Sequence, residues 1–424
     1  MERTTVIFLA ICTLIAGCDP GSEPTNRDGS GGPVSLTVQV GGEPEETRVY
    51  GQLAENFEKE HSDVTIEVVE IADKDEHIAR LASSFASDSP PDVFLVNFRE
   101  YSQFVAQGAI EAVQPLMEER DIVLSDYYPQ PIQAFTFEGT LQCMPQNVSS
   151  LVIYYNKTVF KQAGVPFPAD EWSWDEFRST AEKLSQAGVD GVGIDPEIIR
   201  IAPFVWSAGG EIVDHPEEPT RFTLDQGPAR EALEFLVSLQ HDGLMPTEQD
   251  LAAQDLETRF ATDKLGMLLE SRKVTPGFRE VLDLKWDVTA LPVGEEPAGI
   301  LHSDAYCLSA GSPATETAAD FIAFANGEQS ATVAALSGRT VPSLKTVAES
   351  PAFLASGQPP ANAAAFVDGI PYIRFTPVIP TWPEIEDVAK DVLTRVFYEP
   401  DYSLDQALQD LESRTAPLFE EAHG

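Results

Sequence analysis

Basic residues are scarce in this chain, and their scarcity excludes whole classes of partner. The 424 residues include 27 Lys or Arg against 69 Asp or Glu, so the formal net charge is −42. Nucleic acids and anionic membrane surfaces are bound by clustered Lys and Arg, so we expect neither as a partner. The acidic residues are spread along the chain rather than gathered in a tail.

Histidine is also rare, and no catalytic or metal-binding motif stands out. The six histidines are scattered, without the H-E-x-x-H spacing of a zinc site. The chain has no G-x-S-x-G nucleophile elbow and no Walker loop. Paired carboxylates are so abundant that no single pair argues for glycoside hydrolysis. We therefore expect no catalytic residue, no cofactor and no metal, and a protein that is not an enzyme.

Long apolar runs are absent except at the N-terminus. The run Thr4–Gly17 is too short to span a bilayer and has the length of a signal-peptide core. It ends in L-I-A-G-C at Cys18, which resembles the lipobox of bacterial lipoproteins; the alternative is a chance cysteine after an apolar run. We expect a signal peptide at 1–17 and a lipidated, flexible tether at 18–33, which is rich in Gly, Pro and Ser. The mature protein would then be exported and membrane-anchored through its lipid alone, facing the periplasm or the exterior.

Cysteine is scarce as well. Of the four cysteines, Cys12 leaves with the signal peptide and Cys18 carries the lipid, so Cys143 and Cys307 remain. Export places these two in an oxidising compartment, where a disulfide between them is permitted. Their spacing alone does not establish that their Cα atoms come within reach.

The remaining sequence follows an α/β pattern, which occurs on both sides of one polar stretch. Residues 34–40 and 64–68 alternate apolar and polar, while 93–96 is a continuous apolar run. Strands of this kind alternating with helices predict a parallel sheet. The stretch 143–157 begins with polar residues and ends in an apolar strand, as expected either of a crossover between lobes or of an ordinary strand–loop–strand. The chain length favours two lobes.

Two amide or carboxylate side chains follow predicted strands directly. In open α/β sheets, ligands bind beyond the carboxyl ends of the strands. Asn97 follows the apolar run 93–96, and Glu270 follows the run 265–269. Both are therefore candidates for a binding site, although a short amide can merely close a turn and a surface Glu is common in so acidic a chain.

Several motifs together resemble the extracellular solute-binding proteins of the carbohydrate-uptake class, the maltose-binding-protein-like family of bacterial lipoproteins that serve ABC importers. They are G-G-E-P-E-E-T, P-P-D-V-F-L-V, Q-G-A-I-E-A, M-P-Q-N-V-S-S-L-V-I-Y-Y-N-K, W-S-A-G-G, A-L-E-F-L-V, R-F-A-T-D-K-L-G-M and S-G-R-T-V-P-S. The resemblance implies an α/β, two-lobed periplasmic-binding-protein fold with a hinge of crossover strands. The first lobe would hold 34–145 plus 305–357, and the second 148–302 plus 358–424. Cys143 and Cys307 would then both lie beside the hinge.

The resemblance also implies where a sugar would bind. Carboxylates, amides and guanidinium groups would bind the hydroxyl edges, and aromatic rings would stack on the C–H face. Trp382 and Trp206 occupy positions where the family carries stacking aromatics, although either can be a structural Trp. The region of Asp304 and Tyr306 lacks the glycine pair common in the family, which leaves its local geometry open. The expected ligand-binding residues are Glu43, Asn97, Asn147, Trp206, Glu270, Asp304, Tyr306, Arg339 and Trp382.

The function implied is capture of a mono- or oligosaccharide between the lobes and its delivery to the membrane permease of an ABC importer. We expect a monomer that closes over its ligand by hinge bending. Two alternatives stay open on sequence grounds. The same fold can bind a non-sugar solute such as a polyamine or glycerol phosphate, and a surface glycosidase could use two cleft carboxylates.

Overall fold

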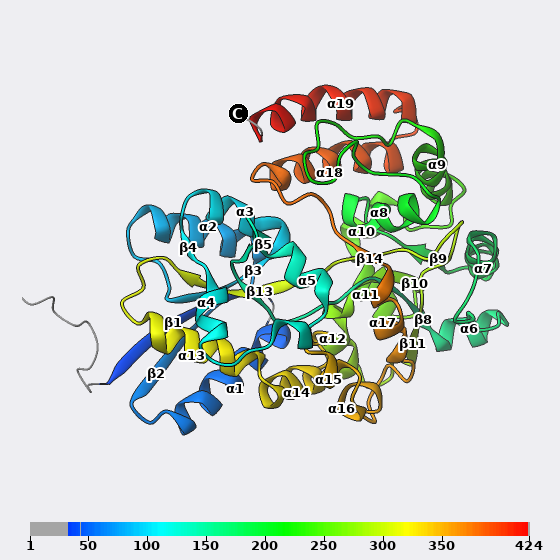
Figure 1. Ribbon diagram of the computed structural model, residues 1–424. Coiled ribbons are helices and arrows are strands. Elements are labelled where there is room, and N and C mark those ends of the chain that lie inside the picture. Colours follow the sequence, from blue (N-terminus) through cyan, green and yellow to red (C-terminus); the bar gives the residue numbers. More distant parts are fainter. Residues whose placement is uncertain (1–32, 43, 423–424) are drawn as a thin grey trace, which may run out of the picture. The chain divides into compact units, whose positions relative to one another are not determined.

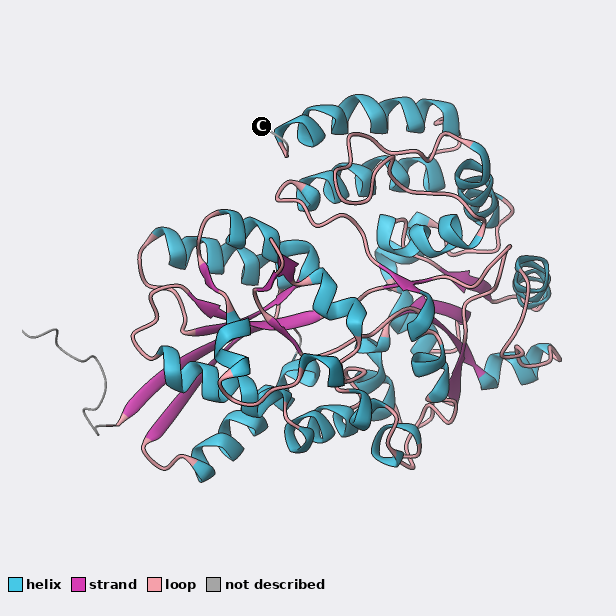
Figure 2. Ribbon diagram, viewed as in Figure 1, coloured by secondary structure: helices cyan, strands magenta, loops and turns pink. Residues whose placement is uncertain are grey.

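The chain folds around two β-sheets that are flanked by helices (Figures 1 and 2). The computed structural model describes residues 33–42 and 44–422. The predicted signal peptide, Cys18 with nearly all of the tether, and the site candidate Glu43 lie outside these residues. In the described part of the chain, no helix is long and apolar enough to cross a membrane.

The first sheet has six strands, in the order β2-β1-β3-β13-β4, with β7 paired to β13. They are β1 (Val34–Gly41), β2 (Val64–Ile71), β3 (Val93–Asn97), β4 (Ile110–Glu111), β7 (Met144–Pro145) and β13 (Asp304–Ser309). β1 pairs in parallel with β2 and β3, whereas β13 runs antiparallel to β3. The alternation predicted for 34–40 is confirmed, because Leu36, Val38 and Val40 are almost fully buried.

Helices cover both faces of this sheet. α2 (Lys74–Ala86) and α3 (Phe98–Ala106) lie on one face, and α1 (Pro44–Glu60) and α13 (Thr315–Asn326) on the other (Figure 1). α3 begins directly after β3, because the Asn97 side chain accepts a hydrogen bond from the Arg99 N–H at 3.3 Å. The end of β3 is thereby fixed to the start of a helix.

The second sheet has four strands in the order β11-β8-β10-β9. They are β8 (Val152–Asn156), β9 (Asp190–Gly193), β10 (Leu265–Glu270) and β11 (Trp286–Thr289). Ser173 and Glu176 form a capping box at the start of α7 (Trp174–Gln186). Only glycine fits at position 191, since a Cβ there would collide with the backbone carbonyl of Ala181 in α7.

Short elements connect and cover the two sheets. They are α4 (Val113–Glu118), α5 (Pro129–Ala134), β5 (Thr136–Phe137), β6 (Thr140–Leu141), α6 (Lys157–Ala163), α10 (Glu248–Ala253), α11 (Leu256–Ala261), α12 (Thr275–Glu280), α14 (Glu328–Ser337), α15 (Lys345–Ala348), α16 (Pro351–Leu354) and α17 (Ala364–Asp368). Together with three short 3-10 helices of the described residues, they form part of the connections between the longer helices and strands.

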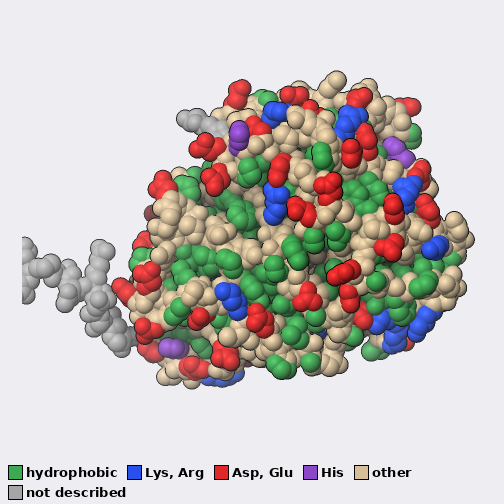
Figure 3. All heavy atoms as spheres, turned by 45° about the vertical axis from the view of Figure 1, so that its right-hand side comes forward, with side chains coloured by type: hydrophobic (Ala, Val, Ile, Leu, Met, Phe, Trp, Pro, Cys, Tyr) green, Lys and Arg blue, Asp and Glu red, His purple; other side chains and the backbone are tan. Residues whose placement is uncertain are grey.

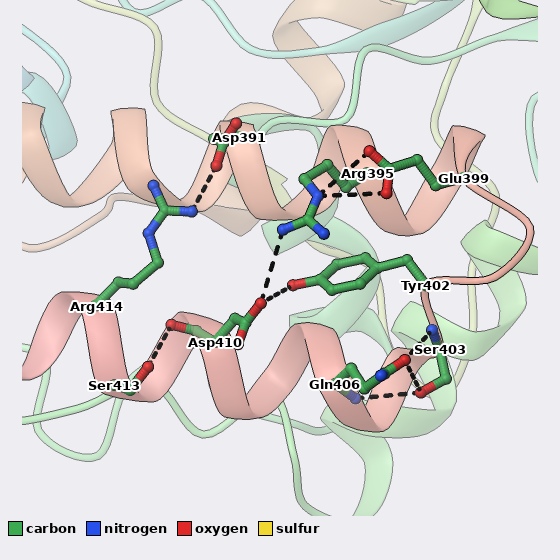
Figure 4. A network of polar contacts seen from close by, with 9 residues as sticks. All are labelled: Asp391, Arg395, Glu399, Tyr402, Ser403, Gln406, Asp410, Ser413 and Arg414. Carbon is green, nitrogen blue, oxygen red and sulfur yellow. Dashed lines mark hydrogen bonds and ion pairs between the residues drawn. The ribbon is translucent and has the colours of Figure 1, made fainter.

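Four longer helices pack together beside the second sheet. They are α8 (Ile198–Ser207), α9 (Gly227–His241), α18 (Trp382–Tyr398) and α19 (Leu404–Glu421). A polar network ties α19 to α18 (Figure 4). In it, Tyr402 donates to Asp410 at 2.6 Å, and Arg414 pairs with Asp391 at 2.5 Å. The guanidinium of Arg395 lies 3.8 Å from the Tyr402 ring centre, so the turn between the two helices is held from both sides.

Three segments cross between the sheets, and the stretch 143–157 is one of them. Its strand β7 pairs with β13 in the first sheet, and its strand β8 belongs to the second. Between these strands, Asn147 forms a β-bridge with Pro342 and Ser149 forms one with His302. The other two crossing segments meet where β12 (Gly299–Ile300) pairs in parallel with β14 (Ile373–Arg374). The crossover interpretation of 143–157 is therefore confirmed.

A disulfide joins two of the crossing segments. Cys143 and Cys307 are bonded, with their Cα atoms 4.4 Å apart, and both are fully buried. Cys143 directly precedes β7, and Cys307 lies in β13, the strand with which β7 pairs. The two cysteines are 164 residues apart, and the loop that they close contains all four strands of the second sheet.

Removing this disulfide should lower the stability of the protein. Because the closed loop is long, the double variant Cys143→Ser/Cys307→Ser should lose about 2–5 kcal/mol in the free energy of unfolding. Urea unfolding with and without reductant measures the loss. Reductant should lower the midpoint for the wild type and leave the double variant unchanged; equal midpoints for all four conditions would contradict a stabilising bridge.

Candidate functional site

A cavity of about 750 Å³ lies between the two sheets, and we call it the cleft. It is found at the carboxyl ends of β3 and β10, the position at which α/β sheets bind ligands. Asn97, Arg99 and Glu100 line it from the first sheet, and Glu270 and Lys273 line it from the second. Its volume lies within the roughly 300–1,000 Å³ typical of small-molecule sites.

One wall of the cleft is a network of buried hydrogen bonds around Asp304. The backbone N–H of Asp304 donates to the Asn147 side chain at 2.8 Å, and the Asn147 amide donates to the His302 carbonyl at 2.9 Å. The Asn97 amide donates to one carboxylate oxygen of Asp304 at 3.0 Å. Arg339 lies 3.5 Å from the other oxygen. The carboxylate of Asp304 is thus held in one orientation at the cleft surface.

The opposite wall contains a buried ion pair with unused donors. Arg200 is only 4% exposed, and its Nη2 donates to Glu270 at 2.6 Å. Its Nε and Nη1 have no hydrogen-bond partner among the described residues, and neither has the Nε2 of His302. A buried donor without a partner is costly. Because Arg200 and His302 both line the cleft, these atoms are placed to bind a ligand.

The charge state of this wall is set by the same contacts. Burial would raise the pKa of Glu270, but the charges of Arg200 and Lys273 and the Ser271 N–H outweigh burial and lower it to about 2. Burial, reinforced by the charge of Arg200, holds the pKa of His302 well below its usual value. Glu270 is therefore ionised and His302 neutral at pH 7. No group of three or more His, Cys, Asp or Glu side chains in the described residues could hold a metal ion.

An ion pair crosses the cleft. Arg99 of α3 contacts Glu386 of α18 at 2.5 Å, and their side chains are 23% and 14% exposed. α3 packs in the core of the first sheet, whereas α18 packs with the helices beside the second sheet. Lys390 of α18 pairs in turn with Glu197 at 2.8 Å. The cations of the cleft are thus largely neutralised by carboxylates, and on the face drawn in Figure 3 acidic side chains are more widespread than basic ones.

Glu100 is a cleft carboxylate without an ion pair to a described residue. Its carboxylate accepts a hydrogen bond from the Gln103 amide at 3.0 Å. Burial raises the pKa of Glu100 to about 7, an effect that Arg99 opposes and that the charges of Glu386, Asp387 and Asp75 reinforce. This carboxyl group titrates near neutral pH inside the cleft.

Among the described residues, no Phe, Tyr or Trp side chain lines the cleft, so the predicted stacking aromatics lie elsewhere in this conformation. Trp382 is fully buried and packs near Phe222 and Phe419. Trp206 is 2% exposed, and the Arg374 guanidinium lies 4.7 Å from its ring centre.

Tyr306 is buried in the same way. It is 1% exposed and packs edge-on against Tyr50 and Phe321 inside the first lobe's core. Asp304 is the first residue of β13 and lies at the cleft, whereas Tyr306 lies two residues further along the same face of the strand, where Tyr50 of α1 and Phe321 of α13 cover it. In this conformation none of the three aromatic candidates offers a ring face to a ligand.

Five of the nine candidate residues do line the cleft: Asn97, Asn147, Glu270, Asp304 and Arg339. The sequence interpretation missed Arg200, the most buried of the arginines that line the cleft. A signal for it existed, because Arg200 is the one charged residue in the apolar stretch 198–206. A lone arginine on a buried helix needs a partner, and Glu270 is that partner.

Comparisons with known proteins agree with this geometry. A family model described as bacterial extracellular solute-binding protein matches residues 52–367. A galactooligosaccharide-binding protein of Bacillus subtilis is 24% identical over 96% of this chain and 96% of its own. An sn-glycerol-3-phosphate-binding periplasmic protein of Pectobacterium atrosepticum is 28% identical, but over only 32% of each chain.

Solved structures share the whole fold. An ABC substrate-binding protein from Listeria monocytogenes, in complex with cycloalternan, superposes with a TM-score of 0.84 at 23% identity. The match covers 92% of this chain and 99% of that protein. The predicted two-lobed fold is therefore confirmed.

Replacing Glu100 by Gln should stabilise the protein at alkaline pH. The folded chain keeps the Glu100 proton up to about pH 7, whereas the unfolded chain loses it near pH 4.5, so stability falls as pH rises through this window. Glu100→Gln removes that loss. Its Tm should exceed that of the wild type by about 2–4 °C at pH 8, and by much less at pH 5.

The matched control is Glu111→Gln, an exposed glutamate in β4 whose side chain makes no hydrogen bond or ion pair with the described residues. Thermal melts across pH 5–8 should show no pH-dependent difference between this variant and the wild type. An equal gain for both variants would mean that loss of one negative charge, and not the cleft, explains the effect.

Proposed function

Because the chain belongs to the family of bacterial extracellular solute-binding proteins, we propose that it captures a mono- or oligosaccharide in the cleft and delivers it to an ABC importer. The observation that carries this proposal is the pair of unused guanidinium donors on Arg200, which lines the cleft together with the orientated carboxylate of Asp304. Donors and acceptors fixed on opposite walls suit the vicinal hydroxyls of a sugar. The chain is a binding protein and not an enzyme, so the glycosidase alternative is set aside.

Recognition in this cleft would rest on hydroxyl edges rather than on ring faces. Asp304 and Glu270 accept hydrogen bonds, and Arg200 and the Asn147 region donate them or hold the acceptors in place. No aromatic side chain is among the lining residues. We therefore expect selectivity to depend on the pattern of hydroxyl groups on the sugar. A buried site whose hydrogen-bonding groups are already orientated strongly disfavours a ligand that leaves them without a partner.

Capture would proceed by closure of two lobes over the ligand. We place residues 34–145 plus 305–357 in one lobe and 148–302 plus 358–424 in the other, a division supported by the strands of the two sheets. The ion pair of Arg99 and Glu386 already spans them. A ligand that contacts both walls favours the closed state over the open one, and this difference in affinity drives the closure.

The protein is exported, as its family is extracellular. We further propose that Cys18 carries the lipid that retains it at the membrane, and that it works as a monomer. The L-I-A-G-C motif supports the lipid anchor. The partner would be the membrane permease of an ABC importer.

A glycerol phosphate is the second candidate ligand. A phosphate group would accept a charge-assisted hydrogen bond from an unused donor of Arg200. The partial match to a glycerol-phosphate-binding relative points the same way, but over only a third of the chain. The acidic groups around the cleft, including Glu386 and Asp304, oppose a dianion, so we favour a neutral sugar.

A ligand screen by thermal shift tests the proposal. Maltose, maltotriose, galactooligosaccharides, glycerol 3-phosphate and spermidine would each be added to the purified protein. We expect at least one saccharide to raise the Tm in a concentration-dependent manner. A shift with glycerol 3-phosphate or spermidine alone would contradict sugar binding.

For the saccharide that binds, Arg200→Lys should weaken the affinity about 10–100-fold, because it keeps the charge but loses the guanidinium fork. Isothermal titration calorimetry measures this change. The control is Arg120→Lys, whose guanidinium pairs with Glu316 and Asp320 away from the cleft. Equal affinities for both variants would remove Arg200 from the site.

A further inference from the structure

A second cavity, of about 740 Å³, lies apart from the cleft, and we call it the basic groove. Its walls come from Lys157, from residues 278–286 around the end of α12 and the start of β11, and from the loop 354–361 after α16. It shares no lining residue with the cleft. The function proposed above makes no use of it.

The charge of this groove is opposite to that of the protein. Its lining includes Lys157, Arg279 and Lys285 and no Asp or Glu, in a chain with 69 acidic and 27 basic residues. Of the carboxylates nearby in sequence, Glu280 pairs with Arg48 at 3.5 Å, and Asp283 does not line the groove. An anionic group entering the groove would therefore meet cations alone.

Two of these cations are not neutralised. Lys157 pairs with Asp287 at 2.7 Å, whereas Arg279 donates to the carbonyls of Pro359 and Leu336 at 2.7 and 3.2 Å. Within residues 33–42 and 44–422, the Lys285 ammonium contacts only the Leu282 carbonyl, at 3.4 Å. The carbonyls of Pro359 and Leu336 hold Arg279 in place, and it forms no ion pair with a described residue. Its charge, like that of Lys285, is available to a partner.

Exposed apolar side chains surround the same groove. Leu282 is 89% exposed and Val281 is 38% exposed, and both line the groove. Leu336, whose carbonyl accepts from Arg279, is 48% exposed. Three of the seven large hydrophobic side chains that are exposed in the described residues thus gather at one place. Such clustering marks an interaction surface, since single exposed apolar residues are ordinary and grouped ones are not.

We propose that the basic groove docks a protein segment that carries carboxylates beside a large apolar side chain. The apolar side chain would pack between Leu282 and the groove floor of Phe278 and Trp286, and the carboxylates would pair with Arg279 and Lys285. A second copy of this chain is a poor occupant, because two molecules of net charge −42 repel each other. An anionic membrane surface is disfavoured by the same repulsion.

The test selects peptides on the full-length protein. A displayed random peptide library is first passed over the double variant Leu282→Ser/Lys285→Glu, which removes peptides that bind outside the groove. The remaining peptides are then selected for binding to the wild type. Both substitutions are at exposed positions, so folding should be retained. We expect enriched peptides with Asp or Glu beside Leu, Ile or Phe. The synthesised consensus peptide should bind the double variant at least about tenfold more weakly, and added salt should weaken its binding to the wild type.

The control is Val123→Ser/Lys183→Glu, which makes the same two changes at exposed positions outside the groove and should bind the peptide like the wild type. Saccharide binding in the cleft should be unchanged in both variants, so failure here is distinct from failure of the proposed function. Enriched peptides that are basic, or that bind both variants equally, would overturn the proposal. So would groove-dependent binding to phosphatidylglycerol vesicles, or a wild-type dimer in sedimentation that the groove variant abolishes.

Discussion

The side-chain amide of Asn147 is the contact on which the rest of the structure depends. It is 3% exposed and lies on the segment that leaves β7 for β8. Its oxygen accepts from the Asp304 N–H and its nitrogen donates to the His302 carbonyl, while Ser303 donates to its backbone oxygen at 2.6 Å. Its backbone also bridges to Pro342. Three parts of the chain far apart in sequence are thus joined at one buried residue. The polar groups of such a buried crossover must find hydrogen-bond partners within the protein, because water does not reach them.

The hydrogen bonds of Asn147 also determine the geometry of the cleft. The hydrogen bond that Asn147 accepts fixes the backbone of Asp304, and Asn97 and Arg339 then fix its carboxylate. The disulfide of Cys143 and Cys307 anchors the same pair of strands from the first-sheet side. The first wall is therefore tied directly to the crossover. The ion pair of Arg200 and Glu270 belongs to the core beside the second sheet, so a relative movement of the two sheets would change its distance from Asp304 and leave the hydrogen bonds around Asp304 in place. Hinge closure requires two walls that each keep their own hydrogen bonds and ion pairs when the lobes move.

Much of this organisation could be predicted from the sequence, and the failures have a common physical origin. Alternation at 34–40 and polar side chains after 93–96 and 265–269 located the strands and their ends, because these signals are local. Burial of an aromatic ring is not local. Trp382 and Tyr306 stand at positions that favour stacking by resemblance, yet their exposure depends on helices α19 and α13, which are distant in sequence. Arg200 was missed for the same reason, since its partner Glu270 is 70 residues away and the pairing becomes visible only in three dimensions.

The two cavities differ in how their cations are balanced, and this difference separates their roles. In the cleft, Arg99, Arg200 and Lys390 each face a carboxylate, so a neutral, hydroxyl-rich ligand can enter without leaving a buried charge unpaired. In the basic groove, Arg279 and Lys285 lack such partners and lie close to water, where an unpaired cation costs little. On a molecule of net charge −42, two uncompensated cations beside exposed Leu282 form the surface at which an acidic partner meets least repulsion. Docking at the groove would therefore orient an acidic partner, because its carboxylates would meet Arg279 and Lys285 on a protein in which acidic residues outnumber basic ones.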